Sequence, residues 1–296
     1  LYAYSDMEMN ELFRGRIPLV EVCCAGPRAI PILERALEQA TGEQELLLAR
    51  VLAMLGSTVG VPVLVEAIAA QLVDETLPER DSRIRYAGAP PDQGAMPDVV
   101  YLLHALGMAR DRRALPIWQR VVDLLAGVTE EEVQSGVKGV FYYVDAVCAG
   151  VERLGDPAAI PMLKQLHRYP PFHDNVCLAG YQVDFFEERL AYLELIIARA
   201  LARCGSPEGV MVLIDYLQDA RALLAEHAHE ELVSISGEDF GKDKAAGRTW
   251  LERQGESLLP VPWLKPSEPI LAWDSPILTV AEEEKSESGL AVERET

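Results

Sequence analysis

The chain has 296 residues and carries 47 acidic against 27 basic side chains, a formal net charge of −20 at pH 7. This balance disfavours a nucleic-acid partner, because binding a phosphate backbone needs clustered Lys and Arg. No stretch reaches the roughly 18 uncharged apolar residues that a membrane span requires. The sequence therefore predicts neither nucleic acid nor membrane as a partner. Alanine and leucine recur and β-branched residues rarely alternate, which predicts an all-α protein.

The N-terminal residues differ from a secretory signal: Asp6, Glu8 and Glu11 stand where a basic start and an apolar run would be. We interpret Leu1 as a cut or processing point. The cysteines are odd in number, form no Cys-x-x-Cys pair and mostly stand among apolar residues, which indicates free thiols in a reducing, cytoplasmic compartment. They are Cys23, Cys24, Cys148, Cys177 and Cys204.

A five-residue block recurs along the chain, and apolar residues follow each copy at helical spacing. The copies are Ala29–Leu33, Gly60–Leu64, Ala114–Trp118, Ala159–Leu163 and Gly209–Leu213. The third residue is proline in four copies and Met211 in the fifth. Because proline suits the first turn of a helix, this column predicts helix starts. The last residues of the blocks share one column and are expected in the core: Leu33, Leu64, Trp118, Leu163 and Leu213.

Upstream of each block a second apolar helix is expected to end in glycine. These glycines are Gly26, Gly56, Gly107, Gly155 and Gly205. The clearest such helix runs from Glu187 to Cys204, with an apolar stripe broad enough to be covered on more than one side. Two helices per unit predict at least four stacked helical hairpins.

Three insertions, at about residues 74–97, 127–139 and 169–186, fall between the first and second helix of a unit. In a stacked array that connection recurs on one edge, so the three loops should gather there. The third loop is rich in aromatic rings: Tyr169, Phe172, Tyr181, Phe185 and Phe186. Two interpretations stay open: the rings pack the loop against its own repeats, or they form a surface for a partner.

The composition changes after Gln254. Residues 255–280 contain five prolines among apolar anchors that include Trp263 and Trp273, which predicts an extended strap lying along the helices or across a partner. Residues 281–296, with the acidic run Glu282 to Glu284, are predicted to be a disordered tail. Residues 1–254 then form the helical array with a terminal cap.

Candidate chemistry is sparse. His227 and His229 are two residues apart, so on a helix they point about 200° apart and cannot grip one ion. His167 falls in the apolar column of its repeat, and His104 lies in an apolar run, so both are interpreted as structural. No nucleophile elbow, phosphate-binding loop or His-Glu-x-x-His motif occurs. The sequence thus assigns no catalytic, cofactor or metal residue, and expects no cofactor.

The stretch Leu154–Leu163 resembles a HEAT repeat of the short bacterial, phycobilisome-lyase-like type, and Gly205–Val210 is similar. Ser236–Gly241, followed by Asp243 and Trp250, resembles the terminal cap of such arrays, with Gly247 where an aromatic residue commonly stands. The resemblance covers residues 17–236 and implies an α-solenoid of about five helical hairpins. Such arrays also occur as C-terminal regions of longer bacterial proteins, including FAD-dependent oxidoreductases.

Two function classes follow. The first is a non-enzymatic scaffold that binds a protein partner or a catalytic domain of its own polypeptide. Its expected contact residues are Tyr169, Phe172, Tyr181, Phe185, Phe186, Trp263 and Trp273. The alternative, which the resemblance implies, is an enzyme subunit such as a HEAT-type bilin lyase. A bound tetrapyrrole would distinguish the two.

Overall fold

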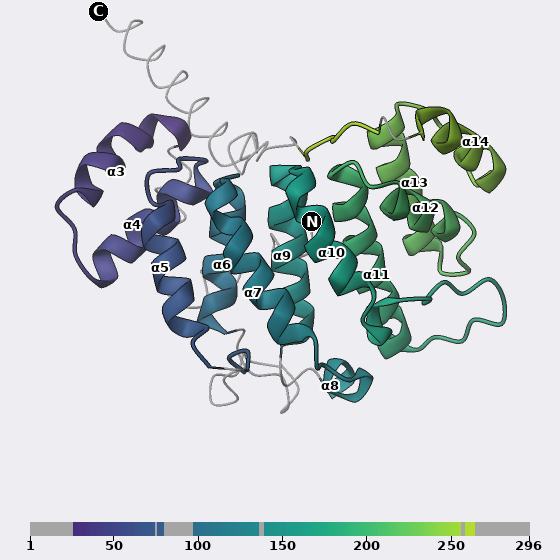
Figure 1. Cartoon of the computed structure of the whole chain (residues 1–296), viewed down its shortest axis with the longest axis horizontal. Helices are drawn as coiled ribbons and strands as arrows, with labels where there is room; N and C mark the ends of the chain where they lie inside the picture. The colour runs from purple at the N-terminus through teal and green to yellow at the C-terminus, as the bar shows by residue number, and fades with distance from the viewer. Residues whose placement is uncertain (1–25, 75, 80–96, 136–138, 256–257, 264–296) are drawn as a thin grey trace, which may run out of the picture.

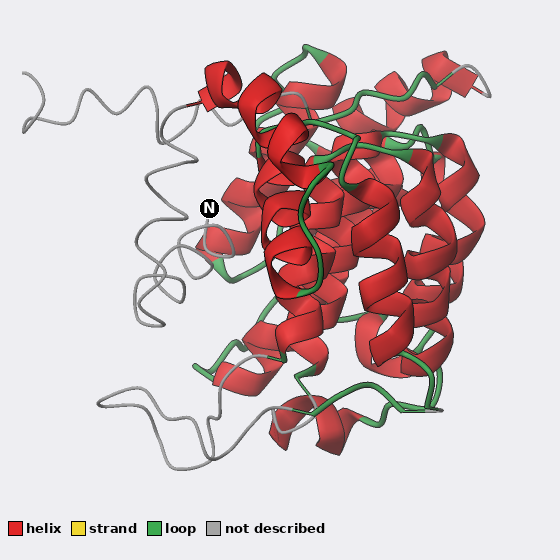
Figure 2. Ribbon diagram, turned by 90° about the vertical axis from the view of Figure 1, so that its left-hand side faces the viewer, coloured by secondary structure: helices red, strands yellow, loops and turns green. Residues whose placement is uncertain are grey.

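The computed structural model describes residues 26–74, 76–79, 97–135, 139–255 and 258–263. Within these ranges the secondary structure is entirely helical, with twelve α-helices and four short 3-10 helices (Figure 2). The prediction of an all-α protein is confirmed. None of the helices in the described ranges is long and apolar enough to cross a membrane.

The α-helices are α3 (Ile30–Leu37), α4 (Glu43–Met54), α5 (Val61–Gln71), α6 (Asp98–Met108), α7 (Leu115–Leu125), α8 (Glu130–Ser135), α9 (Val140–Leu154), α10 (Ile160–His167), α11 (Phe185–Arg203), α12 (Pro207–Tyr216), α13 (Ala222–Ser236) and α14 (Lys244–Gln254). The 3-10 helices are η1 (Gly26–Ala29), η2 (Arg112–Ala114), η3 (Pro157–Ala159) and η4 (Pro170–Phe172).

The helices follow one another across the molecule from α3 at one end to α14 at the other (Figure 1). One row is formed by α4, α6, α9, α11 and α13, in which each helix packs on the next. The intervening helices form a second row: α5 packs on α7, α7 on α10, and α12 on α14. Each helix of the row from α4 to α13 also packs on a helix of the second row, so it is covered by more than one partner.

The proline column marks helix starts as predicted. Pro31, Pro62, Pro116 and Pro161 all stand in the first turn of their helices, where the missing N–H has no intrahelical partner to lose. The fifth repeat differs, because α12 begins at Pro207 instead of near Met211. A proline therefore opens this helix too, but it stands outside the repeated block.

The glycine column is only partly right. Gly56, Gly155 and Gly205 follow α4, α9 and α11 with φ of 85°, 61° and 87°, the left-handed conformation that glycine adopts without a steric penalty. Gly107 does not end its helix, since α6 continues to Met108 and Arg110 takes the left-handed conformation instead, with φ of 52°.

Gly107 is instead a packing residue at the crossing of α6 and α9. A Cβ built on Gly107 would lie 2.7 Å from the Cα of Gly150. A Cβ on Gly150 would lie 2.5 Å from Cζ2 of Trp118, which belongs to α7. The absence of two side chains thus lets the backbones of α6 and α9 touch and gives the Trp118 ring a flat surface to pack on.

The predicted core column holds in four of five repeats. Leu64, Trp118, Leu163 and Leu213 are fully buried. Leu33 is only half-buried, contrary to the prediction, because α3 stands at the end of the described array and α4 is its main neighbour there. The predicted helix from Glu187 to Cys204 corresponds to α11, whose apolar stripe is buried throughout.

Residues 258–263 lie along the C-terminal ends of α9 and α11. The backbone N–H of Val261 donates to the carbonyl of Arg203 at 2.9 Å, and that of Trp263 donates to the carbonyl of Glu152 at 2.8 Å. Carbonyls in the last turn of a helix have no intrahelical partner, so this segment satisfies two of them. Over these six residues the chain lies on its own helices. Trp273 and the acidic tail lie outside the described residues.

We expect Trp118→Ala to be the most destabilising change in the core column, because the ring is fully buried and lies at the junction of three helices. Truncating a buried tryptophan typically costs about 3–5 kcal/mol. Chemical denaturation measures the loss, and Val73→Ala, at a side chain that is 76% exposed, is the control. An unchanged midpoint for Trp118→Ala would contradict the alignment of the repeats.

Gly150→Ala should also destabilise the protein, because the added methyl group meets both Trp118 and Gly107. Overpacking of this kind typically costs about 1–3 kcal/mol. Gly127→Ala is a matched control, since a Cβ there meets no atom within 4 Å. Its free energy of unfolding should stay within about 0.5 kcal/mol of the parent. Equal effects of the two variants would show that the helix crossing is not tightly packed.

Candidate functional site

The described parts of the three insertions meet at one end of α9. The Tyr143 hydroxyl, in the first turn of α9, donates to the carbonyl of Pro78 in the first insertion at 2.8 Å. The second insertion contains α8, which packs on both α9 and η4, and η4 belongs to the third insertion. Figure 1 shows α8 and the loop before α11 along the same lower edge.

Most of the predicted aromatic contact residues in the third insertion pack on the protein itself. Phe172 is fully buried in the core and presents no surface to a partner. The half-buried Tyr169 donates its hydroxyl to the carbonyl of Val122 at 3.2 Å. The Tyr181 hydroxyl donates to the Glu188 carboxylate. These three rings follow the self-packing alternative that the sequence left open.

The other two aromatic residues of this set stand at the start of α11. Phe186 is 43% exposed. The Phe185 side chain lies outside the described structure.

Trp263 is also held by the protein's own side chains. Its ring is half-buried, and the guanidinium groups of Arg153 and Arg199 lie 4.9 and 5.9 Å from its centre. Such cation–π contacts stabilise a ring that would otherwise be exposed to water. The other predicted anchor, Trp273, lies outside the described residues.

A buried ion pair fixes the middle of the third insertion. Arg221 and Asp219 pair through Nη2 and Oδ2 at 2.6 Å, with side chains that are 6% and 0% exposed. The N–H of Cys177 donates to Asp219 at 2.9 Å, and Arg221 donates to the carbonyl of Asn175. Burial by itself raises the pKa of Asp219, but the bonds from Arg221 and Cys177 outweigh it and leave that pKa below its usual value.

Beyond this clamp the loop carries exposed apolar side chains. Leu178 and Val183 are 65% and 87% exposed, and Phe186, the second residue of α11, is 43% exposed. Figure 1 shows this loop extending away from the helices next to α11. Leu223, near the start of α13, is 71% exposed. The loop is thus anchored at its middle, and the protein does not cover its apolar tip in the described structure.

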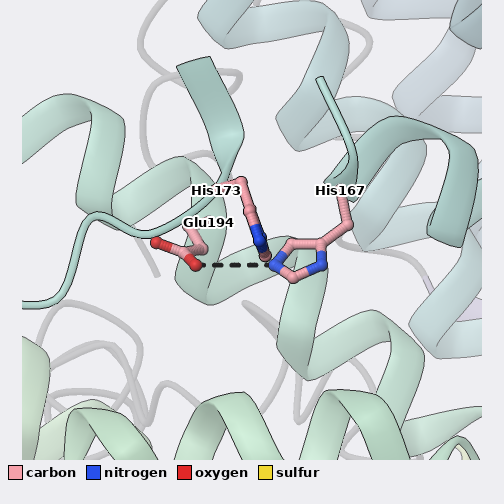
Figure 3. A group of neighbouring side chains, drawn as sticks. All are labelled: His167, His173 and Glu194. Carbon is pink, nitrogen blue, oxygen red and sulfur yellow. Dashed lines mark ion pairs between the residues drawn. The ribbon is translucent and has the colours of Figure 1, made fainter. Parts of the chain in front are cut away.

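A second candidate site lies at the root of the same loop, where three side chains converge (Figure 3). His167 ends α10, His173 follows η4, and Glu194 lies in the middle of α11. One ligand atom from each lies within 4.8 Å of the others. Nε2 of His167 is 3.5 Å from Oε1 of Glu194, and the two imidazole rings meet edge to face at 4.8 Å.

The carboxylate of Glu194 is oriented by the loop. Asp174 adopts a left-handed backbone, with φ of 61°, and the N–H groups of Asp174 and Asn175 both donate to Glu194, at 3.1 and 2.7 Å. The Tyr216 hydroxyl donates to Oε2 at 2.9 Å. Burial by itself raises the pKa of Glu194, but the His167 ring and these donors lower it below its usual value, so the carboxylate is ionised at neutral pH.

His167 points into the interior, as the sequence predicts for a structural histidine, but within the described structure one of its ring nitrogens lacks the hydrogen bond that such a role would give it. Its side chain is 3% exposed, and Nε2 makes no hydrogen bond among the described residues. On the other side of the ring, Nδ1 lies 3.8 Å from the carboxylate of Glu208, which is paired with Lys164 at 2.7 Å. A buried imidazole thus has a carboxylate on each side.

The sequence analysis missed His173 and Glu194. A signal for Glu194 was present, since it is an acid inside the apolar run from Leu190 to Ile197. His173 carries no such signal, because two prolines separate it from α10 and its position depends on the path of the loop. Only folding brings the three side chains together.

The other candidates for chemistry do not converge. Nε2 of His229 pairs with Asp239 at 2.7 Å on the surface. Burial, helped by Arg153, lowers the pKa of His104 to about 3, so this imidazole is neutral at pH 7. Burial raises the pKa of the Cys204 thiol to about 12 and that of Cys148 well above its usual value. These two thiols are therefore poor nucleophiles.

No protein-family model matches the sequence, and the searches of curated proteins and of solved structures also found no match.

Removing the clamp should loosen the third insertion. Asp219→Ala leaves Arg221 buried without its partner, and breaking a buried pair typically costs about 3–5 kcal/mol. Amide hydrogen exchange should speed up at Cys177, whose N–H donates to Asp219, and at Ala220, whose N–H donates to the carbonyl of Cys177. Folding lowers the pKa of Asp219, so the ion pair stabilises the folded state fully at any pH above the usual pKa of Asp. This stabilisation is lost as the pH falls from that value through the lowered pKa of the folded state.

Asp239→Ala is the matched control, since it removes the surface pair with His229 and should leave the exchange of the loop unchanged. If Asp219→Ala left the exchange of Cys177 and Ala220 at the parent rate, the loop would be held by other contacts.

Proposed function

We propose that the chain is a HEAT-like α-solenoid that works as a non-enzymatic scaffold for a protein partner. The observation that carries the proposal is the third insertion, whose tip presents Leu178 and Val183 to solvent while its base is clamped by Asp219 and Arg221. A fixed apolar surface lowers the ordering cost of binding, because less conformational freedom is lost when the partner docks.

The helix arrangement supports the solenoid part of the proposal. Helices with a proline in their first turn, which are α5, α7, α10 and α12 of the second row, alternate along the chain with the helices of the row from α4 to α13. This order is the one expected of stacked two-helix repeats, in which connections of one kind recur along one edge. In such folds extended edges and faces serve as binding surfaces, and insertions add specificity to them.

The chemistry of the surface favours a protein as the partner. The net charge of −20 repels a phosphate backbone, and a loop tip with Leu178 and Val183 offers no groups that read bases or phosphates. Apolar side chains on a fixed loop are suited to a partner with an apolar depression. If the chain is a piece of a longer polypeptide, a catalytic domain of that polypeptide is a partner of this class.

An enzyme subunit of the bilin-lyase type is the second candidate. It rests on the resemblance of Leu154–Leu163 to phycobilisome-lyase-like repeats and would need a reactive cysteine or acid. The raised pKa values of Cys148 and Cys204 speak against these two thiols in such a role. A purified protein that absorbs visible light, with a tetrapyrrole found by mass spectrometry, would favour the lyase over the scaffold.

The scaffold proposal is tested by Leu178→Ser combined with Val183→Ser, which removes the apolar tip without touching the core. A partner recovered with the parent protein should bind the double variant at least about tenfold more weakly, since interface anchors are worth about 2 kcal/mol or more each. The thermal midpoint should not change, because both side chains are exposed in the free protein.

The matched control is Ile32→Ser combined with Val59→Ser, which removes two side chains that are 63% and 51% exposed, on α3 and on the turn between α4 and α5. This control should keep the parent affinity. A partner that binds the Leu178 and Val183 variant as tightly as the parent would rule out the loop as the contact surface.

A further inference from the structure

We propose that His167, His173 and Glu194 form a binding site for one divalent ion of the zinc class, which would join the root of the third insertion to α10 and α11. The site is independent of the proposed scaffold function and departs from the sequence analysis, which assigned no metal ligand. Two imidazole nitrogens and one carboxylate oxygen are a ligand set found in zinc proteins.

The spacing of the ligand atoms fits such an ion. Zinc bonds of about 2.0–2.2 Å in tetrahedral geometry place neighbouring ligand atoms about 3.3–3.6 Å apart. Nε2 of His167 and Oε1 of Glu194 are 3.5 Å apart, close to this separation. The third ligand atom, from His173, is within 4.8 Å of the others. The His173 side chain is 50% exposed, and its Nε2 lies 3.5 Å from Oδ1 of the exposed Asp174, so a rotation toward the pair would give up this surface contact.

A buried ring nitrogen points to a ligand independently of the spacing. Nε2 of His167 is buried and makes no hydrogen bond among the described residues, although the Glu194 carboxylate is near. A polar atom that makes no hydrogen bond in the interior is costly, and proteins rarely leave one in that state. A metal ion between His167 and Glu194 would bond this nitrogen directly, in place of the long contact of 3.5 Å, and would balance the buried carboxylate charge.

The surroundings hold the ligands in the required orientation. Oε2 of Glu194 accepts hydrogen bonds from the N–H of Asn175 and from the Tyr216 hydroxyl. Oε1 accepts one from the N–H of Asp174 and has its remaining lone pair for a ligand on the side of His167. The carboxylate of Glu208 lies 3.8 Å from Nδ1 of His167, on the side of the ring that would face away from the ion. A carboxylate that accepts a hydrogen bond from the other ring nitrogen orients a ligating histidine, and Glu208 stands on that side of the ring, although 3.8 Å is beyond hydrogen-bond distance.

The donor set also selects the class of ion. Mg²⁺ and Ca²⁺ prefer oxygen ligands, whereas imidazole favours zinc and the neighbouring transition metals. Three protein ligands leave a fourth position for water or another ligand. The competing account is that His173 only stacks on His167 at 4.8 Å as an aromatic contact.

The test is titration of the full chain, without an affinity tag and stripped of metal, with Zn²⁺ by calorimetry. We expect one ion per chain and a rise of the thermal midpoint, because an ion that binds only the folded state stabilises it. Co²⁺ as a spectroscopic probe should give a spectrum without a thiolate charge-transfer band. Mg²⁺ should not bind.

Variants identify the ligands. His173→Ala removes an exposed side chain and should fold, yet weaken Zn²⁺ binding by more than about tenfold, the lower end of the loss seen on removing an outer-shell partner. His229→Ala, at another partly exposed histidine, and Cys177→Ser, at a thiol of the same loop, should bind like the parent. The proposal is overturned if the parent binds no Zn²⁺, if His173→Ala binds it undiminished, or if Cys177→Ser abolishes binding.

Discussion

The contact of α6 with α9 through Gly107 and Gly150 is the constraint on which the middle of the structure depends. Because neither residue has a side chain, the two backbones touch, and Trp118 packs on the surface that Gly150 leaves open. A glycine also allows close backbone contact between α4 and α5, since a Cβ on Gly60 would lie 2.6 Å from the Cα of Ala49. Small residues at the crossings set the spacing of the helices, and the larger apolar side chains fill what remains.

Buried charges complement this packing by specifying which helices are neighbours. Glu152 of α9 is fully buried and pairs with Arg199 of α11 at 2.6 Å, and Arg203 of α11 pairs with Glu231 of α13. Desolvation offsets much of the attraction in such pairs, but a wrong neighbour would leave a buried charge unpaired at a cost of about 3–5 kcal/mol. The order of the row therefore depends on charge matching as well as on apolar area. The segment that ends at Trp263 then closes the ends of α9 and α11.

The third insertion joins the two candidate sites. Its root is fixed by the buried Phe172 and by the backbone bonds to Glu194, and its middle is fixed by the Asp219 clamp. Between Cys177 and α11 the chain is free of helix and carries the exposed apolar tip. An irregular loop held at two points can present side chains in fixed positions without a sheet or helix of its own. An ion at the root would act on the same element that we propose contacts a partner.

The sequence by itself determined what depends on local conformation. Proline in the first turn predicted where α5, α7 and α10 begin, and Gly155 and Gly205 predicted helix ends, because φ and the missing N–H act within one turn. Only the tertiary structure decided the role of Gly107, which packs on α9, and the burial of Phe172. The same holds for the meeting of His167, His173 and Glu194, since residues from two helices and a loop converge only when packing sets their distances.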